Sequence, residues 1–375
     1  DAGPVQRLVG GADAETLAYI LGSFLEDQGA GELRDRETRS FPYAAILWTP
    51  TGYRGRSVCF SHVGYGPLRL RSQSPFQSLR LGVAPRTPST LVRGEAQIRV
   101  AGTWASIWAN DDPNFLPEQG EYGRYLLDYE TLGSSLAVAY GLADALELEV
   151  EVEHRSRFGG FMDGFVQGFH DLLGIDQSGR DQVPRDQFRF LLDFGGPRPT
   201  VDLPPQADGT FALNTLVTLQ HNVTCGTATR PAFSYAVTVR YGLDSPDLEG
   251  DNVDVAASVA VARRLGQLYG YLTLGYAWFG SESFHGIPLD DEQATWLAAV
   301  EWRFRPRMSL LVQYLGSQAV VDDVGPFSDL SNEVTLGWKW EVATAGVVEL
   351  GFIENVATFD NSPDFGVHLG WSQRF

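Results

Sequence analysis

The sequence predicts an all-β protein: a twelve-stranded antiparallel transmembrane β-barrel with a small N-terminal α+β appendage. Three observations lead to this fold class. The last residues alternate apolar and polar side chains up to a terminal aromatic residue. Strand-like segments with the same alternation fill most of the chain from residue 92 onward. Short turns alternate with long loops between these segments, and this asymmetry is typical of membrane barrels.

The final segment, residues 364–375, places Val367, Leu369, Trp371 and Phe375 on one strand face, because side chains two positions apart share a face. A strand that ends on its own aromatic residue has no following element to bury that face. The segment resembles the closing strand of bacterial outer-membrane barrels, whose assembly signal is an alternating strand ending in Phe. We therefore expect Trp371 and Phe375 to be recognised by the barrel-assembly machinery.

Twelve strands are expected, and the joints between them orient the barrel. The predicted strands cover residues 92–109, 122–141, 145–157, 211–224, 232–243, 252–264, 267–279, 293–304, 307–318, 331–342, 345–354 and 365–375. Outer-membrane barrels have short periplasmic turns and long external loops. The tight joints near residues 143, 228, 266, 306 and 344 therefore predict the periplasmic side, on which both barrel ends also lie.

Composition narrows the class further. The net charge of −19 argues against nucleic acid as a partner, and 22 Phe, 14 Tyr and 9 Trp suit strands with aromatic girdles at their ends. A soluble β-sandwich would also alternate, and it remains the alternative fold. No leader is recognised at Asp1, so we take the chain as a mature form in the outer membrane of a Gram-negative bacterium.

Residues 1–75 form a separate domain in this prediction, and residues 76–375 form the barrel. A helical pattern begins at Asp13, and two short strands are expected at residues 43–48 and 57–63. This segment is either an appendage on the periplasmic side or a plug inside the lumen. Residues 67–88, rich in Ser, Arg and Pro, are left unassigned. Cys59 of the appendage and Cys225 in a periplasmic turn are expected to form a disulfide, because the periplasm is oxidising.

The long loop after the third strand predicts an amphipathic helix, since its apolar side chains recur at helical spacing and a glycine follows at Gly174. These side chains include Phe161, Phe165, Phe169 and Leu172. The helix would lie on the barrel mouth, fold into the lumen, or contact lipid or a partner. The runs 158–174, 183–188 and 71–76 resemble a family of uncharacterised, porin-like outer-membrane proteins of Gram-negative bacteria, over roughly residues 70–375. That resemblance implies location and barrel fold but no catalytic residues.

Candidate chemistry is sparse. His154 and Ser156 share an outward strand face about 7 Å apart, as in outer-membrane phospholipase A. The Asn-Gly that follows the nucleophile there is replaced by Arg157-Phe158. We therefore expect a protein without catalytic residues, with a lipid hydrolase as the weakest alternative. No cofactor and no metal site are expected. The Asp-rich external loops are interpreted as solvated surface, with binding of Ca²⁺, or of Mg²⁺ bridging to lipopolysaccharide phosphates, as the alternative.

The lumen carries the main functional expectation. Glu147, Glu149, Glu151 and Glu153 would form an acidic ladder on one wall. Basic side chains on other walls are Arg99, Arg240, Arg303 and Lys339. These charges either line a small pore or pair across a closed interior.

Two functions follow from these expectations. The first is a porin-class channel that passes or binds a small solute and is gated by the 158–188 loop or by the N-terminal segment. The second is a structural or docking barrel with a closed lumen that engages a periplasmic or surface protein. Outer-membrane lipid and lipopolysaccharide are the expected surroundings in both cases.

Overall fold

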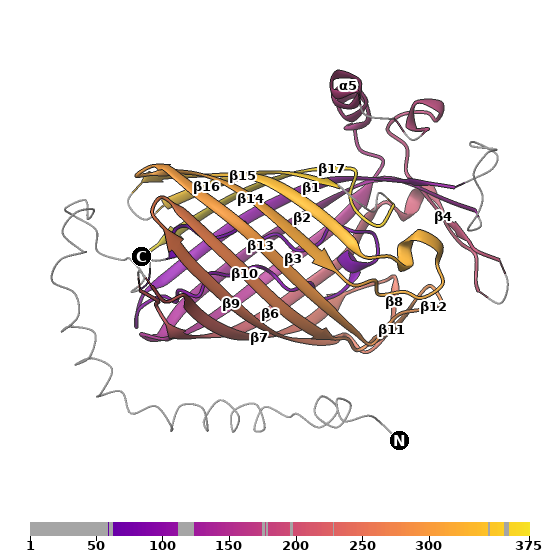
Figure 1. Ribbon diagram of the computed structural model, residues 1–375. Coiled ribbons are helices and arrows are strands. Elements are labelled where there is room, and N and C mark those ends of the chain that lie inside the picture. Colours follow the sequence, from indigo (N-terminus) through magenta and orange to yellow (C-terminus); the bar gives the residue numbers. More distant parts are fainter. Residues whose placement is uncertain are drawn as a thin grey trace. The chain divides into compact units, whose positions relative to one another are not determined.

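The computed structural model shows a closed barrel of twelve antiparallel strands (Figure 1). It describes residues 59, 63–111, 124–174, 177, 179–195, 198–227, 229–343, 346–355 and 360–375. The helix expected from Asp13 and the strand expected at residues 43–48 lie outside these described residues, and the strand expected at 57–63 is described only at Cys59 and Val63, neither of which is in a strand. The first unit of the chain, Asp1–Arg54, also lies outside them, so all described residues belong to the second unit, Gly55–Phe375.

The strands of the barrel agree with the twelve predicted segments to within a few residues. Their bounds are β1 (Ala96–Asn110), β2 (Arg124–Ala143), β3 (Leu146–Phe158), β6 (Gly209–Thr224), β7 (Ala232–Asp244), β9 (Val253–Leu265), β10 (Leu268–Trp278), β13 (Glu292–Arg305), β14 (Met308–Ser317), β15 (Ser331–Ala343), β16 (Gly346–Asn355) and β17 (Phe365–Arg374). Each pairs with its neighbours in chain order, and β17 pairs with β1 to close the sheet. The prediction of a twelve-stranded antiparallel barrel is confirmed.

The smaller elements lie in the long loops or inside the barrel. They are η1 (Gln77–Leu79), α5 (Asp163–Leu173), η2 (Arg180–Gln182), β4 (Arg189–Asp193), β5 (Val201–Leu203), η3 (Pro205–Ala207), β8 (Leu248–Gly250), β11 (Ser281–Phe284), β12 (Ile287–Pro288) and η4 (Gly325–Ser328). β4 and β5 extend the sheet beyond β2, and β8, β11 and β12 form a separate small sheet. No helix in the described part of the chain is long and apolar enough to cross a membrane.

The closing strand behaves as its alternation predicts. Phe375 and Ala96 exchange both backbone hydrogen bonds, at N···O distances of 2.9 and 3.3 Å. The two ends of the barrel therefore meet at one rim, together with the short turns, and we call this rim the short-turn end. The opposite rim is the long-loop end, where β4 and β8 lie (Figure 1).

The outer wall is apolar and the inner wall is polar. Large apolar side chains point outward from the barrel strands, with about half of their surface exposed. Examples are Val100, Leu136, Val152, Val312 and Leu369. The alternate positions are buried and carry Glu, Arg, Ser, Thr and Gln. This arrangement is the reverse of a soluble sandwich, whose apolar faces turn inward.

Candidate functional site: the lumen and its closing segment

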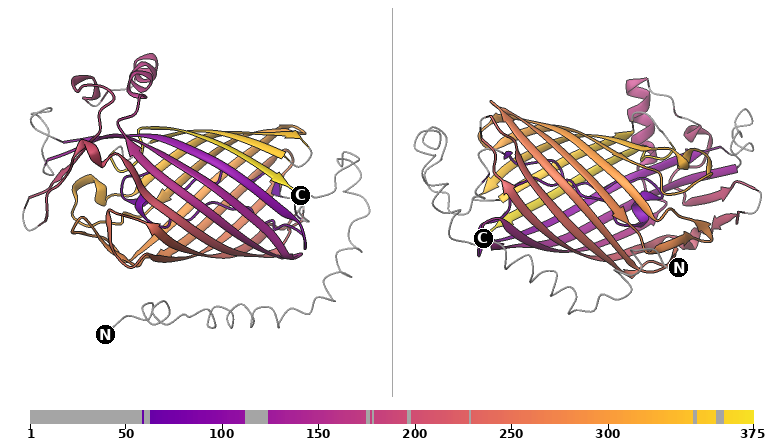
Figure 2. Two further views of the ribbon diagram at one scale, coloured as in Figure 1. Left: turned by 180° about the vertical axis from the view of Figure 1, so that it is seen from behind. Right: turned by 60° about the horizontal axis from the view of Figure 1, so that its bottom comes forward.

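Residues 63–91, here called the lumenal segment, run inside the barrel from the short-turn end to the long-loop end and back. Near the short-turn end, Tyr271 Oη donates to the carbonyl of Val63 at 2.6 Å. At the long-loop end, Ser74 Oγ donates to Asn361 Oδ1 at 2.7 Å. The returning limb reaches Leu91, whose N–H donates to Glu147 at the start of β3, at 2.8 Å. Figure 2 shows this indigo chain within the ring of strands.

The lumenal segment pairs with wall side chains rather than with a strand. The N–H of Leu68 donates to Gln313 at 2.9 Å, and that of Leu81 donates to Asp254 at 3.0 Å. Lys339 Nζ donates to the carbonyl of Pro67 at 2.9 Å. Buried backbone groups need such partners, and here the inward side chains supply them. The domain boundary that we predicted after residue 75 falls within this segment.

Glu149 is the centre of the largest ion-pair cluster in the lumen. Its two oxygens accept a bidentate pair of bonds from Arg69, both at 2.6 Å. Arg86 also lies 2.6 Å away, and Arg99 on β1 lies at 3.2 Å. The Glu149 side chain is 2 % exposed, so its charge is balanced by guanidinium groups and not by water.

The neighbouring glutamates of β3 extend this cluster along the wall. Arg71 contacts Glu151 at 2.7 Å and Glu153 at 3.4 Å, and Arg155 pairs with Glu153 at 3.0 Å. The structure thus places the four predicted glutamates together on the inner face. Most of their partners are arginines of the lumenal segment, for which the sequence pattern predicts no role.

The predicted basic lining residues also face inward. Arg240 pairs with Asp254 at 2.8 Å and donates to Asn214, and Lys339 pairs with Glu349 at 2.9 Å. Arg303 lies over the ring of Tyr65 at 4.6 Å, near the short-turn end. The charges of the wall therefore pair with each other and with the lumenal segment.

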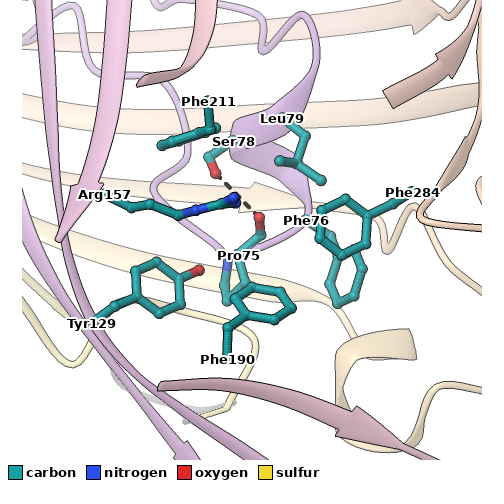
Figure 3. Close-up of a pocket in the computed structure, with 9 residues that line it drawn as sticks. All are labelled: Pro75, Phe76, Ser78, Leu79, Tyr129, Arg157, Phe190, Phe211 and Phe284. Atoms are coloured by element: carbon teal, nitrogen blue, oxygen red, sulfur yellow. Dashed lines mark hydrogen bonds between the residues drawn. The ribbon is translucent and has the colours of Figure 1, made fainter. Parts of the chain in front are cut away.

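The tip of the lumenal segment, around Phe76, packs under residues of the long loops. We call these loop residues, around Phe190, Phe284 and Phe327, the lid. Phe76 lies 5.6 Å from the rings of both Phe284 and Phe327, in an apolar cluster that also contains Leu79 and Phe190. Figure 3 shows the small pocket between tip and lid, where Arg157 lies among aromatic rings and Ser78 Oγ donates to the carbonyl of Pro75. The pocket has room for about one water molecule, so tip and lid are in contact.

Asp247 in the lid balances the buried charge of Arg157. Its Oδ1 lies 3.1 Å from Arg157 Nη2 and 3.0 Å from His285 Nε2. Burial, the largest influence, raises the pKa of Asp247, but the bonds from His285 and Arg157 outweigh burial and hold this pKa below its usual range. Asp247 thus belongs to an ion pair and not to the solvated acidic loop that we expected. Within the described residues, no group of three or more His, Cys, Asp or Glu side chains is placed to hold a metal ion.

A disulfide links Cys59 to Cys225, as predicted, with a Cα–Cα distance of 4.7 Å. Cys225 lies in the turn between β6 and β7 at the short-turn end. The chain is therefore fixed to the barrel rim just before it enters the lumen. The other end of the lumenal segment continues into β1, which is part of the wall.

The predicted loop helix is present as α5, but it lies on the outer wall of the barrel (Figure 1). Met162 and Val166 are buried against Phe365, with Trp104 and Val367 beside them. Gly174 ends the helix in the left-handed conformation, at φ 69°. Phe161, Phe165 and Leu172 are exposed beside this buried group. The lumen is filled by the lumenal segment instead of this loop.

His154 and Ser156 face outward, as strand parity predicts, but their hydrogen bonds lead to different partners. His154 Nε2 bonds to Thr210 Oγ1 at 2.9 Å, and Ser156 Oγ donates to the carbonyl of Leu132 at 3.5 Å. A hydrolase would need the histidine to accept the serine proton. This pair therefore lacks, in the conformation described, the contact that the chemistry requires.

The fold and the lumen define a class: a closed twelve-stranded antiparallel barrel that resembles outer-membrane channels. The chain belongs to the family described as "Protein of unknown function (DUF3187)", which it matches over residues 45–375. No curated protein matches the sequence.

Several solved structures are similar to this chain at a low level. The COG4313 outer membrane channel from Pseudomonas putida F1 is 12 % identical with a TM-score of 0.49, covering 78 % of this chain and 100 % of the channel. The NanC porin is 9 % identical with a TM-score of 0.41, covering 74 % of this chain and 98 % of NanC. The toluene transporter TbuX of Ralstonia pickettii is 10 % identical with a TM-score of 0.38, covering 76 % of this chain and 90 % of TbuX. These identities and TM-scores are too low to transfer a function from any of these proteins to this chain.

Proposed function

We propose that this protein is an outer-membrane channel for a small solute, closed in the conformation described by its lumenal segment. The observation that carries the proposal is the way in which the lumen is closed. A continuous piece of chain fills it, and this piece is held by ion pairs and by hydrogen bonds to wall side chains. The short-turn end would face the periplasm, and the apolar outer wall would face lipid.

A channel explains why the wall is polar. Eight strands enclose an interior that their own side chains can fill, whereas twelve strands enclose a wider one. Here a separate segment occupies the extra space. When it leaves, residues such as Glu151, Gln313 and Glu333 would line an aqueous path, because they already point inward and are all hydrophilic.

Closure by buried ion pairs is energetically suited to a gate. Two charges lose hydration when they are buried, and this loss offsets much of their attraction. In the open state the arginines and glutamates would regain their hydration as they lose their attraction. The free energies of the closed and open states would therefore differ by only a small amount. The wall would also stay acidic along β3, because Arg69, Arg71 and Arg86 would move away with the segment. Cationic solutes would therefore be favoured over anionic ones.

The experiment is a current measurement across planar bilayers with the full chain and with an Arg69→Gln, Arg71→Gln double variant. The matched control is Arg185→Gln, since Arg185 bonds to Gln167 on the outer loop and not to the lumen. We expect brief openings of the wild type and of the control, and much longer open times of the double variant. The opened state should also show a reversal potential on the cation-selective side in a salt gradient. A double variant whose open times match those of the wild type would refute the proposal.

A docking barrel with a permanently closed lumen is the second candidate, and one observation favours it. The lumenal segment is fixed at both ends, by the disulfide at Cys59 and by the start of β1 at Ala96. Silence of all three proteins, with correct folding shown by heat-modifiable migration in gels, would support this candidate instead.

A further inference from the structure

The exposed face of α5 is a row of large apolar side chains on a helix outside the barrel. Phe161 is 66 % exposed, Phe165 is 57 % exposed and Leu172 is 81 % exposed, with the half-buried Phe169 between them. Phe165, Phe169 and Leu172 lie along one side of the helix and Phe161 just before its start, whereas Met162 and Val166 are buried on the neighbouring side. Leaving such a row in water is unfavourable, at roughly 25 cal/mol for each Å² of apolar surface. We therefore expect this face to be covered by another apolar surface.

The helix is fixed to the wall and is not a loosely attached loop. Glu130 of β2 lies on the outward face of its strand, with Leu136 and Val138. Its carboxylate accepts the backbone N–H groups of Phe161 and Met162, which precede the first turn of α5, and the indole N–H of Trp104. A carboxylate at the N-terminal end of a helix also interacts favourably with the helix dipole. A charge that would otherwise face the outside of the barrel is thus covered.

A second buried charge holds the end of the loop on the same wall. Arg180 is 2 % exposed, and its guanidinium lies 3.1 Å from Asp364 and donates to Ser106 at 2.9 Å. Asp364 directly precedes β17, and Ser106 is in β1. The loop therefore sits over the pair of strands, β1 and β17, that closes the barrel.

The exposed face of α5 continues into the lipid-facing surface of the barrel. The ring of Phe365 lies 5.3 Å from Phe165 and 5.7 Å from Phe169. On its other side it lies 6.5 Å from Phe352, which is 44 % exposed on the outer wall of β16. The aromatic side chains thus form an unbroken row from the barrel wall to the helix. Both views in Figure 2 show α5 outside the barrel, projecting sideways near the long-loop end.

We propose that α5 is a lateral membrane anchor, whose exposed face lies in the hydrocarbon of the outer leaflet beside the β1–β17 pair. The continuity with the outer wall argues for lipid, because the same layer of hydrocarbon that covers Phe352 would reach Phe165. The segment 163–173 contains Asp and His but neither Lys nor Arg, so burial of apolar area drives its insertion rather than attraction to acidic headgroups. The inference rests on the membrane location proposed above and not on conduction.

The test is nitroxide accessibility in liposomes, with a spin label at Phe165→Cys or Leu172→Cys of the full chain. Both native cysteines are bonded to each other, so a single new thiol can be labelled selectively. Leu369→Cys on the outer wall is the lipid control, and Asp202→Cys on exposed β5 is the water control. We expect oxygen to relax the labels at 165 and 172 several-fold more effectively than a water-soluble nickel complex, as at 369. The order should reverse at 202.

Each other result overturns the inference in a distinguishable way. Labels at 165 and 172 that behave like the one at 202 would show that the face lies in water. Labels protected from both relaxing agents would show that a protein, such as a second copy of this chain, covers the face. If the nickel complex also relaxed the label at 369 effectively, the proposed membrane location would be wrong, and the proposed function would be wrong as well.

Discussion

Replacement of Glu149 by Gln should open the lumen, because this carboxylate balances three guanidinium groups at once. Arg69, Arg86 and Arg99 lie within 2.6 to 3.2 Å of its oxygens, and its side chain is 2 % exposed. Glutamine keeps the shape but removes the charge. Breaking a buried ion pair from one side costs about 3 to 5 kcal/mol, since the remaining charge stays buried and uncompensated.

This cost falls on the closed state alone. With the lumenal segment displaced, position 149 and the freed arginines would meet water, where the lost charge matters little. A shift of about 3 kcal/mol changes the ratio of closed to open protein roughly a hundredfold, because each 1.4 kcal/mol is a factor of ten. The closing equilibrium should therefore move strongly towards the open form.

The assay is single-channel recording of the Glu149→Gln variant. Glu249→Gln serves as the matched control, because it removes the same charge at an exposed position in β8. We expect the Glu149 variant to stay open for most of the record, and the control to match the wild type. An open fraction that does not change on loss of the Glu149 charge would refute the account of closure by ion pairs.

Three further perturbations test separate parts of the structure. Reduction, or Cys225→Ser, should lower the unfolding temperature, since a 166-residue separation gives about 5 kcal/mol of loop-closure stabilisation; Cys59→Ser combined with it should add nothing more. Gly275→Leu should increase current, because even a Cβ there would lie 2.6 Å from Val83 of the lumenal segment, whereas Gly270→Leu should not, as its Cβ would meet open space. Burial raises the pKa of Asp360 from 3.8 to about 6, so the folded state binds this proton more tightly than the unfolded state does. Stability should therefore fall as pH rises from about 4 to 7, and Asp360→Asn should remove that loss. Melting temperatures that change equally with pH in the wild type and the variant would contradict this prediction.

The barrel could be predicted from the sequence because its signals are local. In β3, the alternation of Leu146, Leu148, Val150 and Val152 with four glutamates assigns an outer and an inner face without any knowledge of neighbouring strands. The short turns and the terminal Phe375 then order the strands around the ring. Each of these signals lies within a few residues of the feature that it predicts.

The lumenal segment could not be predicted in the same way, because it has no period. Many of its backbone bonds go to side chains more than 100 positions away in sequence, such as Gln313 for Leu68 and Asp254 for Leu81. One signal was available. Four arginines lie between residues 69 and 86, and four glutamates face inward on a single strand, so a charge match between the two could have been proposed.

The position of α5 was hidden for a similar reason. Helical spacing predicted the helix itself, but its place depends on Glu130, a single carboxylate on the outward face of β2. A charge with that parity, near the end of a membrane strand, indicates that another part of the chain covers it. The sequence contained this signal, and it concerns one residue rather than a pattern.

The two fixed ends of the lumenal segment determine the direction in which it could leave. Cys59 is bonded to the turn at Cys225, and Leu91 leads into β1 at Ala96, so both ends are held at the short-turn end. Its contacts with the wall are side-chain bonds that water can replace, and no strand pairing has to break. The tip at Phe76 contacts the lid through aromatic rings, beside a few hydrogen bonds such as those from Ser74 to Asn361 and from Gln77 to the carbonyl of Gln318. Opening would therefore begin where tip and lid separate, and the freed loop would withdraw towards the short-turn end. The ion pairs along β3 would then be the last contacts to break, and for this reason Glu149 is a more sensitive point of control than any residue of the lid.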